Sequence, residues 1–188
     1  MTAVVSGGPI VVIQFTSRAE HPKGEPLTIR AATSDDAAAI ADIYNHYVMQ
    51  TVVTFEEEPV VAAEIARRID DVQSASLLWL VAEEKERIVG YAYAAQWRAR
   101  TGYRFSAEVT IYLAPEHTGR GIGSRLYGEL FHLLQARGLH AVMGGITLPN
   151  DASVALHEKF GLRKVAHFKE VGFKFGHWLD VGYWQRTW

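Results

Sequence analysis

The segment that most constrains the fold is residues 108–138, where a strand pattern runs into a glycine-rich turn and then into a helix pattern. Polar and apolar residues alternate at its start, which is typical of a strand and places Glu108 on one face with Thr110 and Tyr112. The helix pattern is an apolar stripe of Leu126, Leu130, Leu133 and Leu134. Gly138 is expected to end this helix, so the segment predicts a strand–turn–helix unit.

The turn has glycine at every second position, and this composition indicates a site for an anion. Gly119, Gly121 and Gly123 lie where the helix begins, so unpaired backbone N–H groups and the positive end of the helix dipole meet there. No Lys stands near the turn, which argues against a nucleoside triphosphate loop, and Ser124 occupies the place of the third glycine in a dinucleotide fingerprint. A phosphate site and a tight turn without a ligand remain as alternatives.

With its strand and helix, the turn Arg120-Gly-Ile-Gly-Ser resembles the acyl-CoA pyrophosphate loop of the GNAT N-acetyltransferase superfamily. Other segments resemble the phosphinothricin N-acetyltransferase-like branch, and are similar also to methionine sulfone and sulfoximine acetyltransferases. These segments are residues 43–47, 54–59, 107–113, 148–161 and 176–185. The resemblance covers about residues 28–185 in unbroken order. Thr118 stands where family loops usually carry Gln or Arg, so we expect mostly backbone contacts to the diphosphate.

The resemblance implies a GNAT fold of the α/β (α+β) class: a central, mostly antiparallel mixed sheet flanked by helices, with strands splayed at the acyl-CoA site. The residue patterns give the same order of elements. Helices are expected over residues 35–47, capped by Ser34, and over residues 60–72. A third helix follows the glycine turn and ends at Gly138, and a fourth runs from residue 151 to Gly161. Strands are expected over residues 27–31, 77–83, 88–97, 106–113 and 140–147, followed by two aromatic-rich strands. Residues 27–188 form the predicted domain, after an extension and linker over residues 1–26.

Composition limits the classes of partner. The chain has 188 residues, of which 48% are hydrophobic, so it is long enough to bury one core. A net charge of -2 without a dense basic run argues against nucleic acid, and the apolar run at residues 10–15 is too short to span a membrane. No Cys is present and the His residues lack a zinc-ligand spacing, so we expect no metal. A cytoplasmic enzyme of one domain is the expectation.

Acetyl transfer to an amine requires a base, because an ammonium group must lose a proton before its lone pair can attack a thioester. Glu108 is the candidate, since it lies just before the glycine turn, where partial burial would raise its pKa. The alternative is a surface glutamate paired with an arginine. His157 occupies the place of a functionally implicated family histidine, and either assists the proton path or is a satisfied core histidine.

Substrate recognition is assigned to two arginines and to an aromatic wall. Arg98 and Arg100 share a face if their strand continues to them, and guanidinium groups bind carboxylates in a bidentate manner. The resemblance implies that the substrate is bordered by Phe55 and Tyr103, with Thr110 on the side of the base. The alternative for the two arginines is a solvated basic loop, and the alternative for Phe55 and Tyr103 is ordinary core packing.

The resemblance also implies an acetyl-CoA site with three parts. Backbone groups of Ile111, Tyr112 and Leu113 would meet the pantetheine arm and the acetyl carbonyl, as an added strand would. Asn150 would bind the pantetheine and Lys159 would reach the CoA phosphates. The pyrophosphate would be held by Gly119, Arg120, Gly121, Ile122, Gly123 and Ser124.

The sequence therefore predicts an acetyl-CoA-dependent N-acetyltransferase that acts, by direct transfer, on the α-amine of a phosphinothricin- or methionine sulfone-like amino acid, as in detoxification. The alternatives are a transferase for another small amine or a protein N-terminus, and a catalytically silent acyl-CoA sensor. A homodimer is expected because the last residues, 173–188, are rich in aromatic side chains. The resemblance implies that the Asp180-Val-Gly182 segment approaches the partner's substrate site, so that Val181 would complete the partner's pocket. The alternative is that the aromatic rings fill the core of their own chain.

Overall fold

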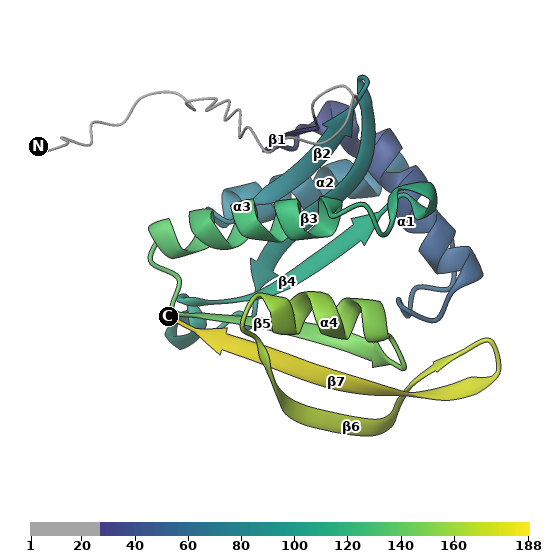
Figure 1. Ribbon diagram of the computed structural model, residues 1–188, viewed down its shortest axis with the longest axis vertical. Coiled ribbons are helices and arrows are strands. Elements are labelled where there is room, and N and C mark those ends of the chain that lie inside the picture. Colours follow the sequence, from purple (N-terminus) through teal and green to yellow (C-terminus); the bar gives the residue numbers. More distant parts are fainter. Residues whose placement is uncertain (1–26) are drawn as a thin grey trace, which may run out of the picture.

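The structure is a computed structural model that describes residues 27–188, and the predicted extension over residues 1–26 lies outside them. One seven-stranded sheet, in the order β1-β2-β3-β4-β5-β7-β6, carries helices on its faces (Figure 1). The strands are β1 (Thr28–Ala31), β2 (Trp79–Glu84), β3 (Arg87–Gln96), β4 (Ser106–Leu113), β5 (Ala141–Leu148), β6 (Arg163–Lys174) and β7 (His177–Thr187). The α-helices are α1 (Ala37–Gln50), α2 (Ala62–Ser74), α3 (Ile122–Ala136) and α4 (Asp151–Lys159), with 3-10 turns at Ser34–Asp36, Thr101–Tyr103 and Pro115–His117.

The sheet is mixed but mostly antiparallel, as predicted. Every neighbouring pair of strands is antiparallel except β4 and β5, which run parallel. Those two strands pair only over three positions, from Ser106 opposite Ala141 to Glu108 opposite Met143, and then diverge (Figure 1). Because β4 stays paired with β3 as far as Leu113, its other edge has no strand partner beyond Glu108 among residues 27–188. This is the splay that the resemblance implied.

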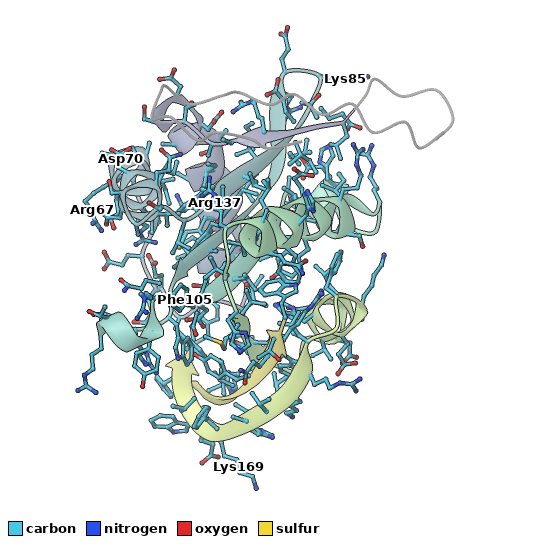
Figure 2. All side chains as sticks on the ribbon, turned by 90° about the vertical axis from the view of Figure 1, so that its left-hand side faces the viewer. Arg67, Asp70, Lys85, Phe105, Arg137 and Lys169 are labelled. Carbon is cyan, nitrogen blue, oxygen red and sulfur yellow. The ribbon has the colours of Figure 1, made fainter. Side chains whose placement is uncertain are left out.

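Two apolar layers hold the sheet between its helices. On one face, Leu126, Leu130 and Leu134 of α3 are completely buried, and burial of each such side chain contributes about 1.5–3 kcal/mol. On the other face, α1 and α2 bury Ile40 and Ile69 against β2 and β3. Figure 2 shows side chains filling the space between the layers, while charged ends such as those of Arg67, Lys85 and Lys169 point outward. The leucine stripe predicted from spacing is therefore the core face of α3.

Several element boundaries differ from the sequence expectation; α2 and β2, for example, start at Ala62 and Trp79 rather than at residues 60 and 77. The Asp36 carboxylate accepts a hydrogen bond from the Thr33 N–H at 2.8 Å, so Thr33 rather than Ser34 begins the first turn, and α1 starts at Ala37. The strand expected to include Trp97 ends at Gln96, before a 3-10 turn. None of the helices within residues 27–188 is long and apolar enough to cross a membrane.

Candidate active site

The free edge of β4 presents backbone groups to the gap between β4 and β5. Ala114 donates its N–H to the Val89 carbonyl at 2.9 Å, and successive strand residues turn these groups to alternate sides. Val109, Ile111 and Leu113 therefore direct theirs away from β3, toward the side where β5 has diverged. The Leu113 carbonyl already accepts a hydrogen bond from the Tyr47 hydroxyl at 2.6 Å. Val109 and Ile111 are left to pair with an extended ligand, as a neighbouring strand would.

The side chains of residues 111–113, the predicted cofactor segment, pack into the two apolar cores. Ile111 and Leu113 pack into the α3 layer, whereas the Tyr112 ring lies on the opposite face, 5.2 Å from the Tyr44 ring. A contact from Ile111 to a ligand in the gap would therefore come from the backbone. The backbone groups of Tyr112 point toward β3 and its ring lies in the other core, so the structure does not place Tyr112 to bind there, which corrects the sequence expectation.

At the open end of the gap lies the glycine loop, residues 119–121, followed directly by α3. Gly119 and Gly121 have φ values of +72° and +79°, a left-handed conformation that favours glycine. Gly121 is the N-cap of α3, and no side chain in the described part of the chain caps the helix, so its first N–H groups and the positive end of its dipole face outward. Gly123 has another role, because a Cβ there would lie 3.3 Å from Leu156 and 3.5 Å from Ile111. The loop is thus shaped as an anion cradle beside the free edge of β4.

Two cationic side chains lie at the glycine loop. Arg120 binds both oxygens of Glu84 at 2.8 and 3.1 Å, and this pair lowers the pKa of Glu84. Its guanidinium is thereby directed toward β2, so a diphosphate would meet the Arg120 backbone. Lys159, from α4, donates to the Ser124 hydroxyl at 2.8 Å and so places its ammonium at the start of α3. Asn150 caps α4 by accepting the Ser153 N–H at 3.2 Å, which leaves its amide N–H groups to donate.

Glu108 lies at the vertex where β4 and β5 separate. Its carboxylate forms no salt bridge with any residue from 27 to 188, which does not fit the surface ion pair considered from sequence. Burial raises the pKa of Glu108, while the neighbouring Tyr183 phenol and the charge of Arg98 act in the opposite direction. A Cβ at Gly145 would lie 3.1 Å from Glu108 Oε1 and 3.2 Å from Tyr183 Cζ, so glycine there leaves space for both groups.

A cavity of about 710 Å³, the substrate cavity, lies beside Tyr183 on the same face of the sheet as Glu108. Four residues predicted to contact substrate line it, namely Phe55, Arg98, Tyr103 and Val181. The structure thus brings together residues from the loop after α1, the β3–β4 connection and β7. Apolar side chains dominate its walls, and Arg98 is the cation that reaches it.

Two other predicted substrate residues lie differently. Because β3 ends at Gln96, Arg98 and Arg100 are not held on one strand face, which corrects that premise of the sequence analysis. Arg98 stacks on the Trp97 ring at 4.5 Å, whereas Arg100 is exposed and does not line the substrate cavity. Thr110 shares the face of Glu108 as predicted, but it lies opposite Tyr93 and outside the cavity wall.

His157 has the environment of a core histidine. It is buried in α4, with Nδ1 2.8 Å from the Ser153 carbonyl oxygen and Nε2 3.0 Å from the Tyr127 hydroxyl. Burial lowers its pKa, so the neutral ring is favoured. A Cβ at Gly144 would overlap this ring, which places His157 on the face of β5 opposite to Glu108.

Several residues of the site were not predicted from the sequence. Tyr183 lies beside Glu108, and Trp97 and Met143 line the substrate cavity. Tyr183 stands two positions after Val181 on β7, so alternation along that strand was the signal that could have identified it.

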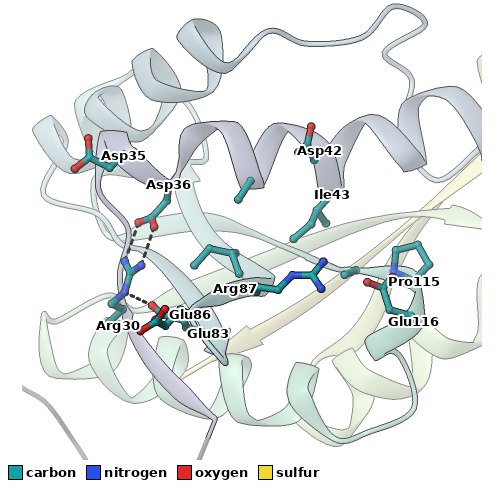
Figure 3. Close-up of a pocket in the computed structure, with 13 residues that line it drawn as sticks. Arg30, Asp35, Asp36, Asp42, Ile43, Glu83, Glu86, Arg87, Pro115 and Glu116 are labelled. Carbon is teal, nitrogen blue, oxygen red and sulfur yellow. Dashed lines mark hydrogen bonds and ion pairs between the residues drawn. The ribbon is translucent and has the colours of Figure 1, made fainter.

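A second cavity, of about 520 Å³, lies away from these groups between α1 and the β2–β3 hairpin (Figure 3). Arg30 spans it and binds Asp36 at 2.7 Å and Glu83 at 2.8 Å. This ion triplet lowers the pKa of Asp36 and ties β1 to the start of α1. The charges of Arg30, Asp36 and Glu83 pair with one another, so we assign this triplet to the stability of the fold.

Comparisons with known proteins identify the family. A model of the family described as acetyltransferase (GNAT) domain matches residues 29–182. The phosphinothricin N-acetyltransferase of Streptomyces viridochromogenes is 41% identical over 165 residues, covering 88% of this chain and 90% of that protein. The L-methionine sulfoximine/L-methionine sulfone acetyltransferase of Salmonella typhimurium is 36% identical over 162 residues, covering 85% and 93% respectively.

Solved structures show the same fold. A phosphinothricin acetyltransferase of Sinorhizobium meliloti in complex with acetyl-CoA has a TM-score of 0.83 at 38% identity, covering 86% of this chain and 88% of that one. An acetyltransferase of Salmonella typhimurium with its cofactor acetyl-CoA has a TM-score of 0.82 at 35% identity, covering 86% and 93%. By its sequence, its fold and the geometry of its site, the chain belongs to the GNAT family and is an N-acetyltransferase.

Proposed function

We propose that the protein transfers the acetyl group of acetyl-CoA to the α-amine of an amino acid of the phosphinothricin or methionine sulfone/sulfoximine type. The observation that carries the proposal is the position of Glu108, a carboxylate with a raised pKa at the vertex between the free edge of β4 and the substrate cavity. The names of the relatives support the substrate class.

Acetyl-CoA would be held by groups that the structure leaves free. The backbone groups of Val109 and Ile111 and the Asn150 amide would bind the pantetheine arm. N–H groups of residues 119–124 would bind the pyrophosphate, with Lys159 beside it. Bound in this way, acetyl-CoA supplies an acetyl carbonyl activated as a thioester.

Glu108 is assigned the role of general base. The substrate arrives as an ammonium ion, and Glu108 accepts its proton, directly or through water, so that the nitrogen lone pair becomes available for direct attack in a ternary complex. The raised pKa of Glu108 makes the carboxylate a stronger base than an exposed glutamate. The backbone N–H groups on the free edge of β4 are assigned to stabilise the developing negative charge on the carbonyl oxygen.

Arg98 is assigned to the substrate α-carboxylate, because it is the cation that lines the substrate cavity. Phe55, Tyr103 and Val181 would then border the side chain of the amino acid. His157, with both ring nitrogens hydrogen-bonded on the other face of β5, is assigned to hold α4 against α3.

We also propose a two-fold homodimer. The C-terminal hairpin, formed by β6 and β7, exposes a row of large apolar side chains: Val165, Phe168, Val171, Phe173, Phe175 and Trp178. Exposed apolar surface of this extent is typical of protein contacts, and Val165, Phe168 and Val171 also line the substrate cavity, so a second copy seated there would close it. Val181 already lines the cavity of its own chain. Light scattering at assay concentration should give a dimer, and a fully active monomer would reject this proposal.

The function is tested by measuring thiol release from acetyl-CoA with a panel of substrates. Phosphinothricin, methionine sulfone and methionine sulfoximine should release thiol, whereas carboxyl-amidated amino acids and peptides with free N-termini should release far less. Faster reaction with the peptides would favour a protein N-terminus as substrate. Tight binding of acetyl-CoA without thiol release for any amine would favour the acyl-CoA sensor instead.

A further inference from the structure

We propose that Gly172 and Lys174 of the C-terminal hairpin interlock with residues 51–61, the loop between α1 and α2, and thereby position Phe55 as a wall of the substrate cavity. The interlock would set how long a substrate side chain the cavity accepts. The control of substrate length rests on the proposed function, whereas the contact between the hairpin and residues 51–61 does not.

Lys174 provides the polar half of the interlock. It is completely buried, and its Nζ donates to the carbonyl oxygen of Thr54, 120 positions away, at 2.7 Å. Burial lowers the pKa of Lys174, and Glu56 and Glu57 support its charge only from a longer distance. Burying an ammonium group against one carbonyl and the Phe175 ring, 5.0 Å away, is costly, and an apolar side chain of similar length would fill the same space. We therefore assign Lys174 the role of holding the loop through the Thr54 carbonyl, in addition to filling space.

Gly172 provides the steric half. A Cβ built on this residue would overlap the ring of Phe55, so glycine is needed for the close approach of β6 to the ring. Phe55 in turn lines the substrate cavity, and 38% of its surface is exposed. The ring thus stands between the hairpin and the space assigned to substrate.

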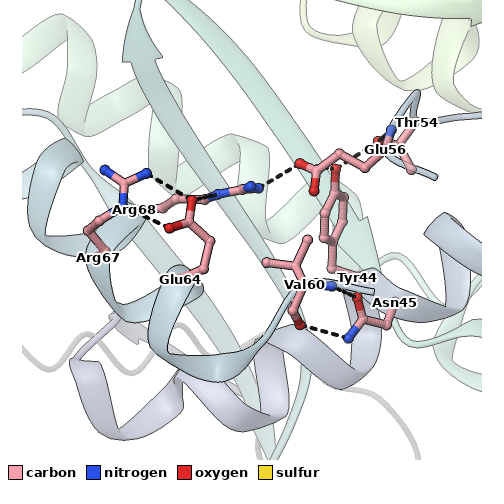
Figure 4. A network of polar contacts seen from close by, with 8 residues as sticks. All are labelled: Tyr44, Asn45, Thr54, Glu56, Val60, Glu64, Arg67 and Arg68. Atoms are coloured by element: carbon pink, nitrogen blue, oxygen red, sulfur yellow. Dashed lines mark hydrogen bonds and ion pairs between the residues drawn. The ribbon is translucent and has the colours of Figure 1, made fainter. Parts of the chain in front are cut away.

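The remainder of the loop is tied to the helices (Figure 4). The Tyr44 and Thr54 hydroxyls lie 2.7 Å apart, Arg68 binds Glu56 at 2.8 Å, and the Asn45 side chain contacts both the N–H and the carbonyl of Val60. These contacts come from α1 and α2 on one side, while Lys174 and Gly172 hold the loop from the other. The loop that carries Phe55 is therefore held from the helices on one side and from the hairpin on the other.

Two variants separate the halves of the interlock. Gly172→Ala forces the Phe55 ring to move, and Lys174→Met removes the hydrogen bond to Thr54 at nearly constant side-chain length. Gly128→Ala on α3 is the matched control, because a Cβ there meets only an ordinary contact, at 3.9 Å from Phe160. A double variant, Gly172→Ala with Phe55→Leu, tests whether a smaller side chain relieves the overlap.

The measured quantity is the ratio of kcat/KM for methionine sulfone to kcat/KM for alanine, with acetyl-CoA affinity measured alongside. Gly172→Ala should change this ratio by about tenfold, the effect of a one-group misfit in an apolar pocket, and Phe55→Leu should bring it partly back. Acetyl-CoA affinity and the Gly128→Ala ratio should stay at the wild-type values. An unchanged ratio in Gly172→Ala would overturn the proposed control of substrate length.

Hydrogen exchange of residues 51–61 tests the contact without any substrate. Lys174→Met should speed exchange of these amides by about tenfold or more while α3 keeps its protection. Unaltered exchange would overturn the anchor. If the wild-type protein acetylated no amino acid, the proposed function would fail, and the exchange experiment would still decide on the interlock.

Discussion

Glu108 and His157 lie on opposite faces of β5, above the adjacent glycines Gly145 and Gly144. The two candidate proton-transfer groups therefore do not face one another. Glu108 is on the side of the substrate cavity, whereas both ring nitrogens of His157 are taken up by Tyr127 and by the Ser153 backbone. The proposed chemistry and the packing therefore lie on two faces of one strand. Substitution of Glu108 should affect catalysis, and substitution of His157 should affect stability.

Replacing His157 should affect stability more than catalysis. His157→Phe leaves the buried Tyr127 hydroxyl and the Ser153 carbonyl without this partner, which should cost about 1–3 kcal/mol in the free energy of unfolding. Denaturant unfolding measures this loss. The shape of the wild-type pH profile of kcat/KM should remain, and loss of one limb of that profile would instead make His157 part of the proton path.

The same histidine predicts how stability depends on pH. Burial lowers the folded-state pKa of His157 below its ordinary value of 6.5, so the unfolded chain binds the proton more readily. The contribution of the neutral His157 ring to the free energy of unfolding is fully present above pH 6.5. This contribution is lost as the pH falls from 6.5 through the folded-state pKa. Unfolding measured from pH 8 to about pH 5 should show this loss in the wild type and a flatter dependence in His157→Phe.

Gly121 is predicted to be needed for acetyl-CoA. Gly121→Val and Gly138→Val impose similar backbone strain, because both glycines have left-handed φ values, +79° and +78°, with open space around the position of a Cβ. Only Gly121 begins α3 at the proposed pyrophosphate site. Calorimetry should therefore show weaker acetyl-CoA binding for Gly121→Val alone. Equal affinities in the two variants would remove the pyrophosphate from this loop.

Arg98 and Arg100 offer a matched pair for the substrate carboxylate. Arg98→Ala should raise KM for an amino acid much more than for its carboxyl-amidated analogue, because only the acid uses the guanidinium. Arg100→Ala, outside the substrate cavity, should change both KM values little. Steady-state kinetics with both compounds measures this. If the two arginine variants behaved alike, both side chains would contribute only through the charge of an exposed loop.

Local patterns predicted most of the fold, including the strand, turn and helix around the glycine loop. Alternation identified β4, the leucine stripe identified α3, and the glycines identified the turn between them, because each signal lies within a few residues. Contacts between segments that are far apart in the sequence could not be predicted from such local patterns. Tyr183 reaches Glu108 only because β7 pairs with β5, and the separation of Arg98 from Arg100 depends on where β3 ends. Buried Lys174 carried no sequence signal, since its partner is a backbone carbonyl 120 positions away.

The central claim is that Glu108 removes the proton from the amine, and the kcat/KM of wild type and Glu108→Gln across a pH series tests it most directly. Near neutral pH, where the amine is protonated, the variant should be slower by about two to four orders of magnitude with acetyl-CoA affinity unchanged. The defect should narrow toward pH 9–10, because the amine then loses its proton to water without help. Turnover near the wild-type value at neutral pH, or a defect of constant size at every pH, would contradict the assignment.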